Sequence, residues 1–401
     1  MTVHAKTQHP HETPHYHHWP LAGVLFLFVL WLGVFSVHDP ATWIYIRTGA
    51  DILARRALPL SDTFSYTVWG QAWTTDSWLS DVLFRHLDQS APWALPALKC
   101  VVAAAAFALL LPVNPASPLT AAGVLALAAV SAWPGLVETP GIFDFILLAL
   151  LVRVLRPKRK FGWAMVAQVG IIELLWSNLH GSAAFLGLWL VGLKVVKTSL
   201  HAGREDRLRF GALLAAAFSG LALNPHGPAV VTQMFSGIPP MDAWPPLSAW
   251  LNLYVLFVLA GAAACWICLQ EEFFLSLSAA TLLFVSWLVP SWRPLYALAA
   301  APVITLALAH FFQPLKDKPI RVLKLALVLA GMLALHWYAI YVPLGQARGY
   351  GSRAWDGAVN FLRSNGVNGR MFNEVGSGDA LAAMSGRQVF VDSRVGLYGP
   401  A

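Results

Sequence analysis

The sequence has few charged side chains. Only 12% of its 401 residues are Asp, Glu, Lys or Arg, whereas 57% are hydrophobic. Average proteins carry charge at roughly 25% of their positions, so this composition excludes a cytosolic enzyme. Apolar stretches of about 20 residues recur along the chain, and each is long enough to cross a bilayer core of ~30 Å. The composition therefore predicts an all-α polytopic membrane protein.

The sequence has only three cysteines, and its first residues lack the features of a signal peptide. Cys100, Cys265 and Cys268 all lie in apolar stretches, so we expect packing residues rather than a disulfide framework or a zinc site. The first residues are rich in histidine but contain neither the apolar run nor the small-residue cleavage site of a signal peptide. We predict a disordered cytoplasmic tail over residues 1–18, with a metal-binding tract as the less favoured alternative.

Hydropathy predicts a transmembrane domain over residues 19–343 with about eleven helices. The predicted spans are 19–37, 94–113, 118–134, 140–156, 162–179, 182–200, 208–223, 247–268, 273–290, 294–312 and 320–343. Lys and Arg are concentrated in the connections after the fourth, sixth and tenth spans, which marks these connections as cytoplasmic. The N-terminus is therefore predicted inside and the C-terminus outside. The net charge of +7 has the same origin, so no nucleic-acid partner is expected.

Two polar segments are predicted to lie outside the membrane. Residues 38–93 form the first outer loop, in which 42–56 has the pattern of an interfacial helix. A β-prone run at 64–69 and a second amphipathic helix at 76–87 follow. Residues 344–401 form a small outer α/β segment with a helix near 354–364 and a β-prone run at 388–392.

Polar residues gather at the outer ends of the predicted spans, where they are candidate site residues. They are His38, Asp39, Glu173, Asn178, His180, His226 and Arg293. Polar groups at membrane depth are costly and often mark function, so we expect one cavity beneath the 38–93 loop. The alternative for each single residue is a helix end that meets the lipid headgroups.

For four residues, a purely structural role must be weighed beside a role in a site. Asp39, one residue beyond a span, is placed to act as a base toward an acceptor hydroxyl or as a metal ligand, or to cap the helix that begins near Thr42. Asp62 favours a turn former, and Asp76 a helix cap. Arg293 suits phosphate binding, with a snorkelling cation as the equal alternative.

Several motifs of this chain resemble those of a bacterial polytopic membrane protein family similar to the C-type membrane glycosyltransferases. They are His38-Asp39-Pro40-Ala41-Thr42-Trp43, the run from Pro59 to Thr67, Trp176 to Gly181, Leu223 to Gly227, and Val389 to Gly399 with Asp392 and Arg394. The resemblance extends from about residue 20 to the end of the chain. It implies a multi-pass protein of the bacterial inner membrane that transfers a sugar from a polyprenyl-phosphate donor to an acceptor on the outer face.

The resemblance also implies roles for particular residues. Asp39 matches the acidic residue that serves as catalytic base in an inverting transfer, while His180, His226 and Arg293 would stabilise the leaving phosphate, assisted by His38 and Asn178. Asp62, Asp76 and Glu173 are further candidates. A second acid typical of this loop is absent, because Ala41 and Thr42 follow Pro40. No metal and no other cofactor is therefore expected, and the expected partners are membrane lipid and the lipid-phosphate sugar.

A second hypothesis, from a different class, is a catalytically inactive scaffold subunit that binds other subunits of a membrane complex. The chain ends directly after the last motif, and a truncated outer domain would suit such a subunit. A transporter is less favoured, because no acidic residue lies near the midplane of a broken helix.

Overall fold

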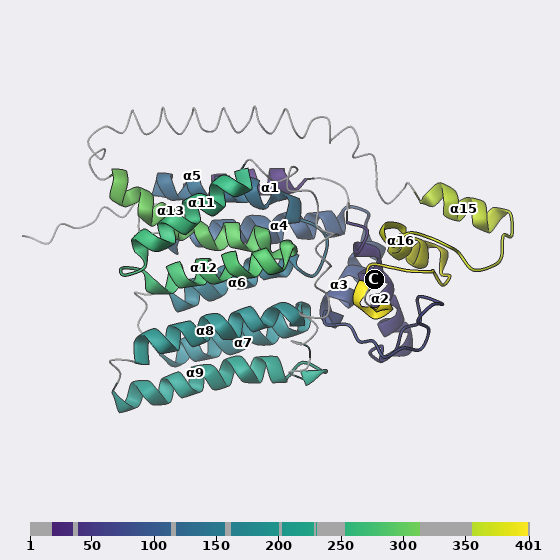
Figure 1. Cartoon of the computed structure of the whole chain (residues 1–401), viewed down its shortest axis with the longest axis horizontal. Coiled ribbons are helices and arrows are strands. Elements are labelled where there is room, and N and C mark those ends of the chain that lie inside the picture. The colour runs from purple at the N-terminus through teal and green to yellow at the C-terminus, as the bar shows by residue number, and fades with distance from the viewer. Residues whose placement is uncertain are drawn as a thin grey trace, which may run out of the picture.

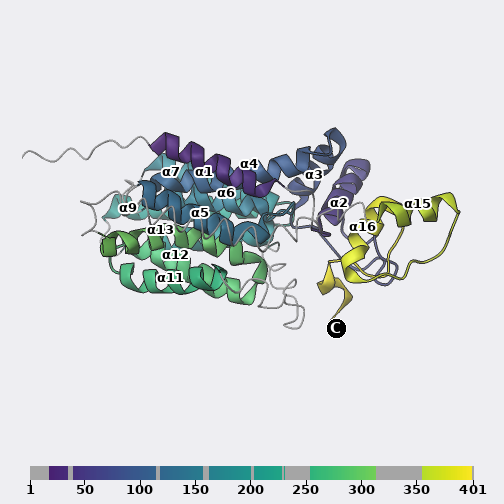
Figure 2. The same ribbon diagram turned by 90° about the horizontal axis from the view of Figure 1, so that it is seen from above.

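The computed structural model describes residues 18–34, 39–113, 118–156, 162–199, 203–227, 230, 253–312 and 355–399. These residues form a bundle of roughly parallel and antiparallel apolar helices with a smaller cap at one end (Figure 1; Figure 2). The bundle contains α1 (His18–Gly33), α4 (Ala94–Leu110), α5 (Pro118–Ala132), α6 (Ile142–Leu155), α7 (Trp163–Leu179), α8 (Ala184–Ser199), α9 (Arg204–Ala222), α11 (Leu253–Cys268), α12 (Phe273–Leu288) and α13 (Arg293–Phe312). The cap contains α2 (Thr42–Arg55), α3 (Trp78–Ser90), α15 (Asp356–Ser364) and α16 (Val375–Ser385).

The all-α architecture predicted from hydropathy is confirmed. Each predicted span from 19–37 to 294–312 coincides with a helix of the bundle, whereas the span at 320–343 and the tail at 1–17 lie outside the described residues. Among the described helices, Ala94–Val113 and Arg293–His310 are long and apolar enough to cross a bilayer, and five further apolar helices are shorter. The number of membrane crossings stays a prediction.

The bundle buries ionisable groups and exposes large apolar ones. Lys99 and Glu138 form an ion pair of 2.7 Å in its interior, and Glu173 is fully buried. In contrast, Trp266 and Phe284 project outward from α11 and α12. Soluble proteins show the reverse distribution. The interior is also rich in buried alanines on α4, α5 and α13, and such small side chains let helix backbones approach closely.

The loop between α1 and α4, predicted to be the first outer loop, folds as two packed helices, α2 and α3. On α2 the buried face contains Ile44, Thr48, Gly49 and Ile52. A Cβ at Gly49 would lie 2.0 Å from the carbonyl oxygen of Asp81 on α3, so only glycine allows this approach. The helix α2 packs against both α3 and α16, so the side chains on its buried face contact protein.

The C-terminal segment corrects one prediction, because its described residues do not form an α/β unit. They contain two helices and an extended stretch, of which Val389 makes a single parallel bridge with Ser65 of the first loop. The Tyr66 N–H donates to the Val389 carbonyl at 3.1 Å, and the Val389 N–H donates to the Phe64 carbonyl at 3.0 Å. A lone strand has unpaired backbone groups, and here the loop satisfies them. The loop between α1 and α4 and the C-terminal segment therefore form one cap.

Candidate functional site

Polar side chains meet where the cap covers the end of the bundle. Asp144, in the first turn of α6, is buried and accepts a hydrogen bond from Nε1 of Trp176 at 2.8 Å. Its other oxygen lies 2.7 Å from Nδ1 of His180, which follows α7. Because Asp144 engages Nδ1, the orientation of the His180 ring is fixed.

His180 carries a positive charge at neutral pH. Burial lowers the pKa of His180, but the attraction of Asp144, the hydrogen bond to it and the charge of Asp76 outweigh burial and raise this pKa to about 9. The side chain retains 20% exposure. A partly accessible imidazolium at the end of the bundle can bind an anion such as a phosphate.

Asp76 ties the cap to the end of α7. Its Oδ2 accepts a hydrogen bond from the Ser182 N–H at 3.2 Å, and its carbonyl accepts one from the Gly181 N–H at 2.9 Å. A Cβ at Gly181 would lie 2.9 Å from this carbonyl, so a larger residue would disturb the contact. The helix cap expected at Asp76 is wrong, because the N-cap of α3 is Ser77, without a side-chain cap hydrogen bond, and the Asp76 carboxylate binds the backbone after α7 instead.

Carboxylates also surround the phenol of Tyr45 on α2. Burial raises the pKa of Tyr45 well above its ordinary value, and the charges of Asp76, Asp39, Asp81 and Asp379 raise it further. These four acids come from the segment before α2, the segment before α3, α3 itself and α16. Of these acids, Asp76 also raises the pKa of His180, so its carboxylate acts on both rings.

Asn178 and Asn224 hold this end of the bundle together. The Asn178 Oδ1 accepts from Nε1 of Trp78 on α3 at 2.8 Å, and its Nδ2 donates to the Leu174 carbonyl at 2.8 Å. Asn224 Nδ2 donates to the Ser177 carbonyl, and its Oδ1 accepts from the His226 N–H at 2.8 Å. Both carboxamides are committed to protein partners.

The His226 ring is placed differently from that of His180. Its Nε2 is buried and has no hydrogen-bond partner among the described residues. Burial lowers the pKa of His226, with the charge of Asp76 acting in the opposite direction. The lowered pKa favours the neutral form of the ring, whose Nε2 is enclosed by protein.

Asp39 does not cap α2, because the N-cap of this helix is Ala41 and carries no side-chain cap hydrogen bond. Instead, Oδ1 of Asp39 accepts a hydrogen bond from the Ala41 N–H at 2.9 Å in a turn just before α2. Arg293 begins α13, is only 7% exposed and lies with its guanidinium carbon 5.8 Å from the centre of the Tyr254 ring. His38 lies outside the described residues.

Glu173 lies apart from these groups, within α7. Neither carboxylate oxygen has a hydrogen-bond partner among the described residues. Gly187 of α8 and Gly220 of α9 approach it so closely that a Cβ on either would lie under 3 Å from its atoms. Its surroundings are therefore helix contacts rather than a cavity.

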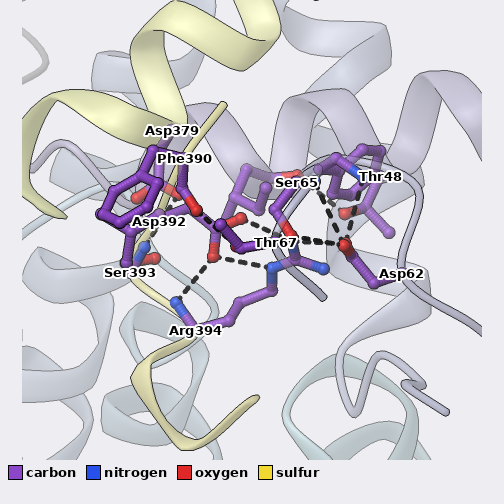
Figure 3. Close-up of polar contacts among 12 residues, drawn as sticks. Thr48, Asp62, Ser65, Thr67, Asp379, Phe390, Asp392, Ser393 and Arg394 are labelled. Atoms are coloured by element: carbon purple, nitrogen blue, oxygen red, sulfur yellow. Dashed lines mark hydrogen bonds and ion pairs between the residues drawn. The ribbon is translucent and has the colours of Figure 1, made fainter. Parts of the chain in front are cut away.

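Asp62 is both a turn former and one half of a long-range ion pair. It is fully buried, accepts hydrogen bonds from the Phe64 and Ser65 N–H groups at 3.0 and 3.1 Å, and accepts one from Nη2 of Arg394 at 2.6 Å. Nε of Arg394 also donates to Asp392 at 2.9 Å. Figure 3 shows Arg394 between the two aspartates, which come from opposite ends of the sequence.

Aromatic rings enclose this ion-pair cluster. The guanidinium carbon of Arg394 lies 4.9 Å from the centre of the Phe64 ring and 4.5 Å from that of Trp73. Such stacking with a desolvated guanidinium is favourable. Asp392 and Arg394 were noticed in the sequence only as parts of a motif. The cluster clamps the C-terminal segment onto the first loop.

Asp379 of α16 is a buried acid that the sequence did not single out. Its Oδ1 accepts from the Ser393 N–H at 3.2 Å, and its Oδ2 has no partner among the described residues. Burial and then the charge of Asp392 raise the pKa of Asp379 to about 7, although the Ser393 hydrogen bond and Arg394 act in the opposite direction. No local pattern marks such a residue, because its environment is built by segments distant in sequence.

The described residues contain no group of three or more His, Cys, Asp or Glu side chains that could hold a metal ion.

Comparison with known proteins places this arrangement in a structural class. No protein-family model matches the chain, and no curated protein sequence matches it. The fold, however, is similar to that of a C-type membrane glycosyltransferase. The predicted resemblance is therefore confirmed at the level of the fold.

The solved structures in question are of the oligosaccharyltransferase of Archaeoglobus fulgidus. Its apo form aligns with a TM-score of 0.64 and 13% identity, over 94% of this chain and 65% of that one. Its complex with Zn and sulfate gives 0.58, 13% and coverage of 93% and 62%. The form tethered by a disulfide to an acceptor peptide with the NVT sequon gives 0.58, 13% and coverage of 94% and 64%. The chain thus spans less than two thirds of that enzyme, and the similarity concerns the fold.

Proposed function

We propose that this chain is a membrane glycosyltransferase that transfers a sugar from a lipid-phosphate donor to an acceptor on the outer face of a bacterial inner membrane. The observation that carries the proposal is the fold similarity over 94% of the chain at a TM-score of 0.64. The polar groups at the capped end support it, because the candidate base, the imidazolium of His180 and the neutral imidazole of His226 lie at this end.

Exposed tryptophans support a membrane location. Six exposed tryptophans lie at helix ends, and each is more than half exposed. The start of α1, the start of α7 and the end of α11, which carry Trp19, Trp163 and Trp266, lie at the uncapped end of the bundle (Figures 1 and 2). The end of α1, the start of α4 and the end of α12 lie at the capped end and carry or adjoin Trp31, Trp93 and Trp287. Aromatic residues form belts at the two interfaces of membrane proteins. Lys197 and Arg207 lie at the uncapped end, so the positive-inside rule makes that end cytoplasmic and the capped end outer.

The proposed reaction is a single displacement with inversion. Asp39 takes the proton of an acceptor hydroxyl, whose oxygen forms a bond to the anomeric carbon of the donor sugar. The bond from that carbon to the phosphate oxygen breaks, and the lipid phosphate leaves with the electron pair. His180 and Arg293 offset the negative charge of this leaving group. Asn178 and Asp76 position the cap.

The variant Asp39→Asn tests this proposal. Asn keeps the side-chain oxygen that accepts the Ala41 N–H, so folding should survive, whereas loss of a general base should lower transfer by ~10²- to 10⁴-fold. The measurement is accumulation of the lipid-linked sugar, or loss of sugar from the acceptor, in cells carrying the variant. Asp206→Asn, at the opposite end of the bundle, is the matched control. Normal transfer by Asp39→Asn would contradict the proposal.

A catalytically inactive scaffold subunit is the second candidate. The observation that favours it is the hydrogen bond from the Ala41 N–H to Asp39, since this carboxylate already serves the local backbone. The two candidates differ in purification. A scaffold should be isolated in a fixed ratio with other membrane subunits and should tolerate Asp39→Asn, whereas an enzyme should be isolated alone or with copies of itself.

A further inference from the structure

The cap has a hollow at some distance from the bundle (Figures 1 and 2). It lies between α15, the turn at 365–372 and α16, and has a volume of about 540 Å³. Figures 1 and 2 show α15 at the far end of the molecule, beyond α2 and α16. The hollow is therefore distant from the helices that would lie in a membrane and from the polar groups around His180.

The walls of this hollow are mainly apolar. They include Trp355, Phe361, Leu362, Met371 and Phe372. Phe361 is 61% exposed and Phe372 is 84% exposed. The neighbouring apolar core is small and contains only four buried residues among those described, Val359, Leu381, Ala382 and Val389. Large exposed aromatics beside a small core indicate a surface that another molecule covers.

The charge of the hollow has one sign. Arg370 and Arg387 line it, and no Asp or Glu is among the lining residues. Arg370 lies 5.1 Å from the centre of the Tyr66 ring, and Arg387 donates to Oδ1 of Asn368 at 3.2 Å. Neither guanidinium forms an ion pair with a described residue. Both arginines are thus held in place while their charges remain uncompensated.

We propose that this hollow is a docking site for an acidic segment of another protein, in which an aromatic or aliphatic side chain enters the hollow and flanking carboxylates pair with Arg370 and Arg387. Aromatic residues, Met and Arg are the side chains enriched at the centres of protein interfaces. The planar guanidinium binds carboxylates through two parallel hydrogen bonds. Because α15, which forms one wall of the hollow, lies at the far end of the molecule from the bundle (Figures 1 and 2), a partner protein fits the position of the hollow better than a lipid headgroup.

The experiment uses the full chain in neutral detergent and three sets of short fluorescent peptides. Each peptide has one central Phe or Leu, flanked by Glu and Asp, by Ser, or by Lys. Fluorescence anisotropy should give a dissociation constant about tenfold or more lower for the acidic set than for the Ser set, because two charge pairs contribute. Binding of the acidic set should weaken as salt is raised. The Lys set should bind weakest.

Variants assign the binding to the hollow. The double variant Arg370→Gln/Arg387→Gln should remove the preference for the acidic set, and Phe372→Ser should weaken the acidic and Ser sets alike, because it removes the apolar contact. Arg55→Glu, on α2 of the same cap and outside the hollow, should change neither. A thermal unfolding scan establishes that each variant is folded, and the milder Phe372→Leu replaces Phe372→Ser if the latter is not.

Three results would overturn the proposal. The first is equal binding of the acidic and Ser sets, and the second is an acidic preference that survives Arg370→Gln/Arg387→Gln in folded protein. The third is absence of peptide binding together with tight binding of vesicles rich in anionic lipid that depends on the two arginines, which would assign the surface to a membrane. None of these results bears on sugar transfer, which is measured separately with Asp39→Asn.

Discussion

Gly187 on α8 offers a sharp test of how the buried Glu173 is enclosed. A Cβ at this position would lie 2.0 Å from Oε1, 2.6 Å from Cδ and 2.7 Å from Oε2 of Glu173, and these are its three nearest atoms. The carboxylate has little room to move away, because Gly220 of α9 packs against the Cβ of Glu173 on another side. Gly187→Ala should therefore destabilise the bundle by about 1–3 kcal/mol, as overpacking does elsewhere.

The same geometry predicts a rescue. In Glu173→Ala/Gly187→Ala the atoms that meet the new methyl group are gone, so the double variant should recover most of the loss caused by Gly187→Ala. The coupling energy between the two sites should be about 1–3 kcal/mol. Gly220→Ala should not be rescued in this way, because its Cβ would also lie 2.7 Å from the backbone nitrogen of Leu174.

Equilibrium unfolding in mixed micelles gives the free energies for this double-mutant cycle. Gly192→Ala is the control on the same helix, since nothing lies within 4 Å of its added Cβ. It should be neutral or slightly stabilising, because alanine has the higher helix propensity. The reasoning is refuted if Gly187→Ala is as harmless as Gly192→Ala, or if removing the Glu173 carboxylate leaves the defect of Gly187→Ala unchanged.

Three further predictions concern the cap and the orientation of the chain. Arg394→Lys should loosen the C-terminal segment, because an ammonium cannot bridge Asp62 and Asp392 as the guanidinium does. Proteolysis within 375–399 should therefore accelerate, and an unchanged rate of proteolysis would show that the clamp is dispensable. Because the pKa of Asp379 is raised to about 7, its contribution to cap stability is greatest at low pH and is lost as pH rises through 7. Hydrogen exchange at the Val389 amide, corrected for intrinsic rate, should therefore increase from pH 5 to 8 in the native chain but not in Asp379→Asn, and a parallel increase in both would exclude this acid as the cause. Reporters fused after Lys160 and Gly351 should read cytoplasmic and outer, respectively, and a cytoplasmic signal at Gly351 would reverse the outer assignment of the cap.

The sequence by itself determined where the helices of the bundle lie. Each described helix of the bundle coincides with a predicted span, because the requirement for apolar length is local and can be read from a short window. The helix cap expected at Asp39 is not formed, but the same local logic correctly placed His180 at a helix end. It could not show that Oδ2 of Asp144 lies 2.7 Å from Nδ1 of His180.

The tertiary structure alone decided which distant segments meet. Asp62 and Arg394 are 332 positions apart, so no local pattern could pair them. The β-prone run at 388–392 suggested an α/β unit, but its Val389 pairs with Ser65 of the loop between α1 and α4. Glu173 was expected in a cavity because a buried acid often marks a site, yet its surroundings depend on glycines of two other helices. Hydropathy and propensity are properties of neighbouring residues, whereas ion pairs, glycine contacts and shifted pKa values depend on which elements approach one another in space.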